Sequence, residues 1–179
     1  MTRADFNDLV RQLNRNLYGH AYRILRSQEE AEDAVQEVFI KLWNLGKKLD
    51  EYTNVPALAV TMTRNYCIDQ IRKKKPFTED IDKNDIKNSN DASPHELMDN
   101  KESEKIVDDI IDQLPDIYKV VIVLREFEDM SYEEIAEKTS QNINTLRVTL
   151  SRARKMIREE FNKYQYERRG IKESDSKIL

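Results

Sequence analysis

A stretch near the C-terminus combines short polar side chains with cations on one face of an expected helix. Apolar residues recur every three or four positions from about Ile143 to Phe161, which predicts a long helix. At roughly 100° per residue they share one side of that helix, and the opposite side is polar and rimmed by cations. Small side chains can reach base edges in a major groove, while Arg and Lys bind guanine edges or phosphates. The candidate DNA-contacting residues are Asn144, Thr145, Arg147, Val148, Ser151, Arg152, Lys155 and Arg158.

A shorter helix is expected immediately before this one. Ser131-Tyr-Glu-Glu134 has the pattern of a capping box, in which the first and last residues bond each other's backbone N–H groups. A polar turn at Ser140-Gln141-Asn142 then separates the two helices. A short helix, a tight turn and a long basic helix are typical of a helix-turn-helix. Basic helix faces are common and are often merely solvated, so the turn and the capping box are what favour DNA binding here.

The remainder of the chain is also expected to be helical. Helical spacing predicts helices over about 6–24, 28–45, 56–75 and 116–127, and one ending at Leu114. Ser27 to Glu30 forms a second capping-box pattern, and residues 46–54 are expected to form a loop. Cys67 lies within a helix and is expected to be a small packed residue. The buried side of the helix after Ser27 is expected to consist of Ala31, Ala34, Val35, Val38, Phe39, Leu42 and Trp43.

The composition favours small helical units over one large core. The chain has 179 residues, of which 39% are hydrophobic and 36% charged. Residues 77–93 are acidic and lack any period, which is typical of a linker, and Ser93-Pro94-His95-Glu96 has the pattern of a helix start. We therefore predict an all-α chain with two small helical domains joined by a flexible acidic linker. The predicted bounds are 1–75 and 104–165 for the domains, 76–103 for the linker and 166–179 for a candidate disordered tail.

The formal net charge of −4 conceals a segregation of charge along the chain. Residues 1–75 carry +3 and residues 145–172 carry +6, whereas 76–103 carry −5 and 104–137 carry −8. Local patches rather than the sum decide whether a protein binds nucleic acid. Two basic segments suggest two contacts with a polyanion, although charge alone favours this no more than ordinary solvated helix faces.

Several classes of protein are disfavoured by what the sequence lacks. It has no apolar run approaching 18 residues and no signal-peptide pattern, so we expect neither membrane insertion nor secretion. A single cysteine fits the cytoplasm. We find no glycine-rich phosphate loop, nucleophile elbow or zinc-protease motif, and His20 and His95 are isolated. We expect no catalysis by this chain, no metal, no cofactor and no small-molecule substrate.

Two sets of motifs, one in each expected domain, resemble the extracytoplasmic-function (ECF) type of bacterial RNA polymerase sigma factor, within the sigma-70 family. In the first domain, Ala31-Glu-Asp-Ala-Val-Gln-Glu-Val-Phe39 with Leu42-Trp43 resembles region 2.2, and Thr63–Asp69 with Arg72–Lys75 resembles regions 2.3 and 2.4. In the second, the segments that resemble region 4 are Leu114-Pro115, Leu124-Arg-Glu126, Ser131–Ala136 and Leu150–Arg154. The resemblance covers about residues 6–162.

This resemblance implies a protein that binds core RNA polymerase and directs promoter-specific transcription initiation. It implies contacts with the β′ clamp helices and the β flap, −35 recognition by residues 144–155, and an anti-sigma factor as partner. The loop 46–55 would accept a flipped base of the −10 element, and the acidic linker would thread polymerase channels. The residues that match the β′ docking positions are Asp33, Gln36, Glu37 and Lys41. Those implied in −10 recognition and melting are Lys47, Lys48, Tyr52, Arg64, Asn65, Asp69, Arg72 and Lys73.

The sequence departs from the family pattern at a few positions, and other functions stay open. Leu58-Ala59 stands where Trp-Leu is frequent, Ser140 replaces a turn glycine, Asp129-Met130 stands where a glycine is common, and Thr149 replaces a frequent arginine. These departures leave the promoter sequence open. The main alternative is a helix-turn-helix regulator that acts without being a polymerase subunit and dimerises to read two half-sites. A structural adaptor, whose basic face is idle, is the third.

Overall fold

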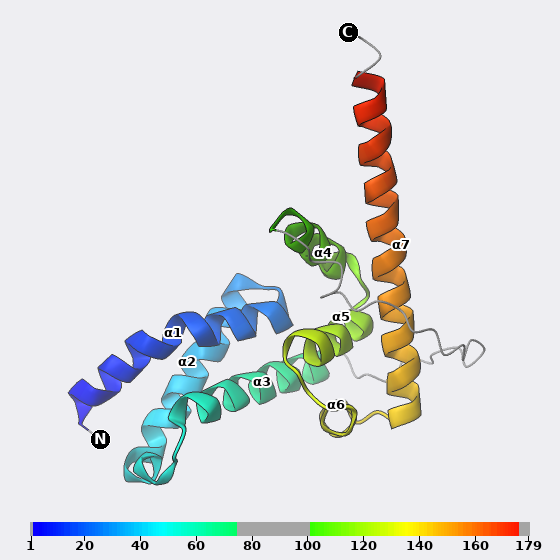
Figure 1. Ribbon diagram of the computed structural model, residues 1–179. Coiled ribbons are helices and arrows are strands. Elements are labelled where there is room, and N and C mark those ends of the chain that lie inside the picture. The colour runs from blue at the N-terminus through cyan, green and yellow to red at the C-terminus, as the bar shows by residue number, and fades with distance from the viewer. Residues whose placement is uncertain (1, 75–100, 176–179) are drawn as a thin grey trace. The chain divides into compact units, whose positions relative to one another are not determined.

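The computed structural model describes residues 2–74 and 101–175, and every regular element in those ranges is helical. The helices form two compact units, one containing α1 to α3 and the other containing α4 to α7 (Figure 1). This confirms the predicted all-α, two-domain fold class. The N-cap predicted at Ser93 and residues 76–100 of the predicted linker lie outside the described residues.

The first unit is a bundle of α1 (Arg3–Leu25), α2 (Gln28–Leu45) and α3 (Val55–Lys74), in which each helix packs against the other two. Leu17, Leu42 and Ile68, one from each helix, are fully buried. Burying such a side chain contributes about 1.5–3 kcal/mol to stability. Cys67 is also fully buried, as predicted. The short break between α1 and α2 is made by Arg26, whose left-handed backbone (φ 54°) returns its N–H to the carbonyl of Tyr22.

Residues 46–51 correct one prediction, because they form a 3₁₀ helix, η1 (Gly46–Glu51), rather than a loop. Gly46 has a φ of 53°, a left-handed value that favours glycine, and it allows the chain to leave α2 abruptly. Leu49 is only 2% exposed and anchors the turn in the first unit. The sequence of 46–54 is polar apart from Leu49, Tyr52 and the glycine, so a single apolar anchor gave too little periodicity to predict a helix.

The second unit comprises α4 (Lys101–Gln113), α5 (Asp116–Ile122), a π-helical turn η3 (Val123–Phe127), α6 (Tyr132–Thr139) and α7 (Ile143–Asp175). The helix predicted over 116–127 is therefore an α-helix that passes into a π turn. α7 packs against α4 and α5. Val121 of α5 and Leu146 of α7 are fully buried.

The last helix is longer than the sequence predicted. We expected it to end near Phe161 and the tail from residue 166 to be disordered, but α7 continues to Asp175. The added turns contain no proline and only one glycine, so nothing in them terminates a helix. Arg168 Nη1 also lies 2.5 Å from Glu102 Oε1 of α4, an ion pair that ties the extension to the second unit. In the described ranges, no helix is both long enough and apolar enough to cross a bilayer.

Candidate nucleic-acid interface

The helix-turn-helix predicted from the sequence is present in the second unit. Ser131 and Glu134 form the expected capping box: Ser131 N donates to Glu134 Oε2 at 2.8 Å, and Glu134 N donates to Ser131 Oγ at 3.2 Å. Between α6 and α7, Ser140 takes a left-handed φ of 56°, and Asn142 Oδ1 accepts from Asn144 N at 2.8 Å. The chain therefore changes direction at Ser140, the position where the family pattern has glycine. Asn142 caps the N-terminus of α7.

The candidate −35 residues lie along α7, at exposed and half-buried positions. Asn144, Arg147 and Lys155 are exposed, and the helix rise of about 1.5 Å per residue spreads them over roughly 16 Å, enough to cross a major groove about 12 Å wide. The opposite side, with Leu146, Leu150, Ala153 and Ile157, is fully or almost fully buried. The remaining candidates are half-buried: Thr145, Val148, Ser151, Arg152 and Arg158.

Two residues of α7 face inward although their types and positions left this open. Thr149, which stands where the resembling family frequently has arginine, is fully buried, and its hydroxyl donates to Thr145 O at 2.9 Å. Arg154 donates to Glu126 Oε1 of η3 from Nε at 3.0 Å and from Nη2 at 2.5 Å. Burial is the largest single influence and acts to lower the pKa of Arg154, but the hydrogen bond and charge of Glu126, together with Tyr132, outweigh it and leave that pKa raised. Arg154 is therefore a charged structural residue of the second unit.

The candidate −10 residues of the first unit come from two elements. Lys47, Lys48 and Tyr52 lie on or just after η1 and are exposed. On α3, Arg64 and Asn65 are half-buried, while Lys73 is exposed near the helix end. Asp69 and Arg72 are also exposed and are paired with each other at 2.9 Å. The cationic end of α3 thus presents Arg72, Lys73 and Lys74 in its last turn, where cations interact favourably with the helix dipole.

The candidate docking residues, Asp33, Gln36, Glu37 and Lys41, are all exposed on α2. The opposite side of the same helix is buried, including Ala34 and Val38. Lys41 Nζ lies 5.0 Å from the ring centroid of Tyr66 on α3. Burial, followed by the negative charges of Glu37 and Asp33, raises the pKa of Tyr66. Tyr66 therefore lies beside the acidic face, a neighbour that the sequence alone did not single out.

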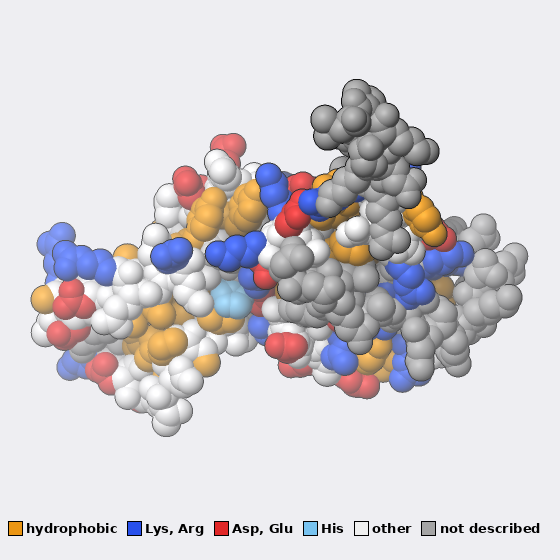
Figure 2. Space-filling model, turned by 45° about the horizontal axis from the view of Figure 1, so that its top comes forward, with side chains coloured by type: hydrophobic (Ala, Val, Ile, Leu, Met, Phe, Trp, Pro, Cys, Tyr) orange, Lys and Arg blue, Asp and Glu red, His pale blue; other side chains and the backbone are white. Residues whose placement is uncertain are grey.

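An aromatic group at the edge of the same helix corrects a second prediction. Trp43 was expected in the core, but it is 49% exposed, and Phe39 is half-buried. Phe6 of α1 meets Trp43 edge-on at 4.9 Å and Phe39 at 6.4 Å between ring centroids. Ile40 is 53% exposed, and the surface in Figure 2 shows hydrophobic side chains reaching solvent among polar and charged ones. Helical spacing placed Trp43 near the apolar side, but the side chain lies at the edge of the bundle, where it packs edge-on against Phe6.

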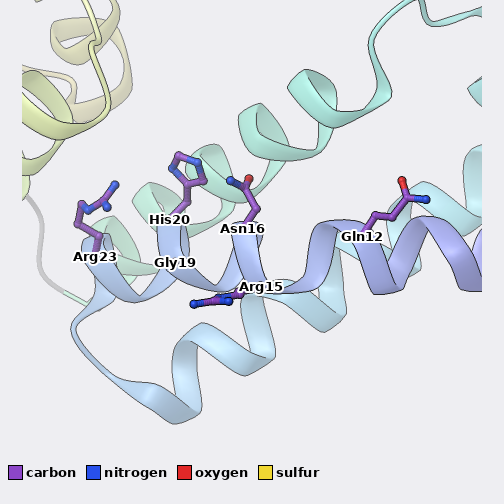
Figure 3. A pocket seen from close by; sticks show the side chains of 6 residues that line it. All are labelled: Gln12, Arg15, Asn16, Gly19, His20 and Arg23. Atoms are coloured by element: carbon purple, nitrogen blue, oxygen red, sulfur yellow. The ribbon is translucent and has the colours of Figure 1, made fainter.

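A hollow lies along α1, and none of the residues that line it is a predicted site residue. It is lined by residues of that helix at intervals of one, three and four positions, which Figure 3 labels: Gln12, Arg15, Asn16, Gly19, His20 and Arg23. Within the described ranges, no group of three or more His, Cys, Asp or Glu side chains could hold a metal ion.

Comparison with known proteins matches both units to regions of one family. The model for "Sigma-70 region 2" matches residues 9–77, and the model for "Sigma-70, region 4" matches residues 104–157. The ECF RNA polymerase sigma-E factor of Haemophilus influenzae is 35% identical over 164 residues, which cover 85% of each chain. The RNA polymerase sigma-H factor of Pseudomonas aeruginosa is 30% identical over 163 residues, 85% of this chain and 83% of that protein.

A solved structure shares the fold. It is a co-crystal structure of the sigma factor RpoE with the anti-sigma factor NepR from Bartonella quintana. The match has a TM-score of 0.53 at 23% identity and covers 88% of this chain and 97% of the other. At this identity the likeness concerns the arrangement of the helices.

Proposed function

The chain belongs to the extracytoplasmic-function group of the sigma-70 family of RNA polymerase sigma factors, and from that premise we propose which of its surfaces serve each task. As a sigma factor it binds core RNA polymerase and promoter DNA and confers promoter specificity on initiation. The alternative of a helix-turn-helix regulator outside the polymerase is not favoured, because the matching sigma factors span both units rather than the second alone.

The acidic face of α2 would dock on the β′ clamp helices. Asp33, Gln36 and Glu37 lie within one turn of each other and are exposed, so they form one continuous polar strip. The helix beneath them is fixed by burial of its other side between α1 and α3. This combination of an exposed acidic strip with a packed opposite side is the observation that carries the proposal. Lys41, the fourth docking candidate, would shape the rim of the strip from its place over the Tyr66 ring.

The two DNA contacts would divide between duplex and separated strands. Asn144, Arg147 and Lys155 of α7 would enter the major groove of the −35 element, flanked by the half-buried candidates. At the −10 element, Tyr52 beside η1 offers an exposed aromatic ring for a flipped base, 46% exposed. Arg64, Asn65 and the cationic end of α3 would bind the melted strand, because cations and stacking must offset the few kcal/mol of unpairing.

The remaining assignments follow from membership in this family. We place the two functional domains at residues 1–75 and 104–165. The second domain would contact the β flap, and the linker would lie in the polymerase channels. The chain would act in the cytoplasm as a regulatory subunit without catalysis of its own. An anti-sigma factor would hold it inactive by covering the polymerase-binding and DNA-binding surfaces.

Binding to core polymerase tests the docking assignment. Purified protein and sigma-free core RNA polymerase from the same host should co-elute in gel filtration at near one-to-one stoichiometry. Replacing both Gln36 and Glu37 with Ala should weaken that binding about tenfold or more, because several polar contacts at the centre of an interface are lost together.

A matched variant separates docking from a general loss of charge. Asp8→Ala with Gln12→Ala removes one carboxylate and one amide from exposed positions of α1, and should leave polymerase binding unchanged. Circular dichroism should show the same melting temperature for both double variants within about 2 °C, since surface changes cost little stability. Equal polymerase affinity of the Gln36/Glu37 variant and the wild type would overturn the assignment.

A further inference from the structure

Tyr132, the first residue of α6, lies beneath the guanidinium groups of two arginines. Arg125 of η3 has its guanidinium carbon 4.8 Å from the ring centroid, and Arg147 of α7 has its own at 5.7 Å. Both distances fall within the range of about 6 Å in which a cation is attracted to the face of an aromatic ring. One of the two cations, Arg147, is also a candidate DNA-contacting residue.

The ring itself is firmly placed. Ser131 and Glu134 cap the start of α6 through two reciprocal bonds, which fixes the backbone at Tyr132. Arg125 Nη1 donates to Met130 O at 2.7 Å, so the first guanidinium is anchored to the loop that leads into α6. Tyr132 is half-buried, with part of its ring open to Arg147. The fixed parts of the cluster therefore lie on η3 and α6, and the exposed Arg147 side chain rests against them.

We propose that Tyr132 is a positioning residue for promoter recognition, and that its ring holds the Arg147 guanidinium ready for contact with the −35 duplex. The inference rests on the proposed function, because it takes Arg147 as a DNA-contacting residue. A free arginine side chain samples many rotamers and loses that freedom on binding DNA. Contact with the ring removes part of this freedom before DNA arrives, and Arg guanidinium groups stack on aromatic faces while keeping their donors available.

A double-mutant cycle in the complete sigma factor bound to core polymerase tests this. The probe is a promoter duplex that gives a run-off transcript with wild-type holoenzyme. Tyr132→Leu should weaken binding of the duplex about five- to tenfold, whereas Tyr132→Phe, which keeps the ring, should stay within about twofold of wild type. In an Arg147→Ala background, Tyr132→Leu should have no further effect. Tyr164→Leu, at a 39% exposed position farther along α7, serves as the matched control and should leave affinity unchanged.

The other outcomes overturn the inference in distinguishable ways. An equal loss from Tyr132→Leu in the wild-type and Arg147→Ala backgrounds would show that Tyr132 acts without Arg147. An unchanged promoter affinity of Arg147→Ala would also overturn the inference, because Arg147 would then not contribute to DNA binding. In both cases, run-off transcription by the wild type would show that the proposed function stands. Failure of wild-type protein to bind core polymerase would instead overturn the proposed function. If Tyr132→Leu lowers the melting temperature strongly, Tyr132→Met, an unbranched apolar side chain, takes its place in the cycle.

Discussion

The two units present their candidate DNA-contacting residues in different ways. In the second unit all of them lie on one helix, α7, whose opposite side is buried. In the first unit they come from η1, the segment after it and α3. A face on one helix follows from the period of the sequence, whereas a surface built from several segments depends on how they pack. This difference explains why the −35 residues could be argued from angles, while the −10 residues were named only through a family resemblance.

Two of the ion pairs, one from each unit, also differ in how far they are exposed. In the second unit the Arg154–Glu126 pair joins α7 to η3, with side chains 22% and 10% exposed. In the first unit the Arg72–Asp69 pair is about half exposed on both sides, and Lys74 pairs with Glu30 at the surface. A partly buried pair depends on both partners far more than a solvated pair does. The stability of α7 in the second unit should therefore be sensitive to the loss of one internal charge.

The largest effects should come from cavities made separately in the two cores. Leu150→Ala in α7 and Leu17→Ala in α1 each remove a side chain that is at most 1% exposed. Each should lower the free energy of unfolding by about 2–5 kcal/mol, as buried Leu→Ala changes do. Leu150→Ala should weaken binding of a −35 duplex by the second unit and retain docking of the first unit on core polymerase. Leu17→Ala should weaken that docking and the −10 contacts and retain binding of the −35 duplex. Urea denaturation followed by circular dichroism, with gel filtration and DNA binding, measures this. Loss of both activities in both variants would contradict the division into two units.

Removing one acid from each unit should sharpen the contrast between their ion pairs. Glu126→Ala leaves the partly buried Arg154 without its carboxylate partner, and we expect a loss of about 2 kcal/mol. Asp69→Ala breaks an exposed pair and should cost less than about 1 kcal/mol. Urea denaturation measures both, and Glu126→Gln, which keeps an acceptor oxygen, should fall between wild type and Glu126→Ala. Equal losses from the two alanine variants would mean that burial does not decide how much each ion pair contributes to stability.

Local signals predicted the elements of the second unit well. The capping box at Ser131, the polar turn and the angular distribution along α7 all depend on residues close in sequence. The end of α7 was misjudged, because a helix without proline stops where its stabilising contacts stop, and Glu102 lies far away in the chain. Tyr132 was missed for the same reason: its contacts with Arg125 and Arg147 join three helical elements.

In the first unit, helical spacing identified which residues share a side but not how far the core extends. Leu42 and Trp43 are adjacent, yet Leu42 is fully buried and Trp43 is 49% exposed. Trp43 lies at the edge, where Phe6 near the start of α1 is its aromatic neighbour. The N-cap at Ser27 was predicted correctly, since Ser27 Oγ accepts from Glu30 N at 3.4 Å. The Glu30 carboxylate, however, bonds Lys74 of α3, a partner 44 residues away in sequence.

A smaller effect is expected at the capping box that starts α6. Ser131→Ala removes the hydroxyl that accepts from Glu134 N, and should lower the free energy of unfolding by about 1 kcal/mol. Because Tyr132 is the next residue in the chain, loss of the cap should also weaken promoter binding, whereas binding to core polymerase should not change. Thermal melting and DNA titration measure the two effects. Ser131→Thr, which keeps the hydroxyl, should retain most of the stability, and an equal loss from both variants would show that the cap is not responsible.

The smallest effect is expected at the corresponding capping box of the first unit. Thr2 N donates to Asp5 Oδ2 at 2.8 Å, and Asp5 N donates to Thr2 Oγ1 at 3.2 Å. The bond from the Thr2 backbone, followed by the Thr2 side chain, lowers the pKa of Asp5 below 3.8. Because the folded pKa is lowered, this contribution to stability is present at neutral pH and is lost as the pH falls through the folded pKa.

NMR titration of the Asp5 carboxyl group measures that shift directly. Thr2→Ala should bring the pKa part of the way back toward 3.8, because it removes the side-chain bond but keeps the backbone N–H, which is the larger cause. Thr2→Ser, which keeps the hydroxyl, should leave it low. The melting temperature should hardly change in either variant, since the box lies at an exposed helix end, whereas Ser131 precedes the residue that supports Arg147. A pKa of Asp5 that does not differ between Thr2→Ala and Thr2→Ser would show that the hydroxyl has no part in the shift. The lowered pKa of Asp5 would then come chiefly from the hydrogen bond of the Thr2 backbone N–H.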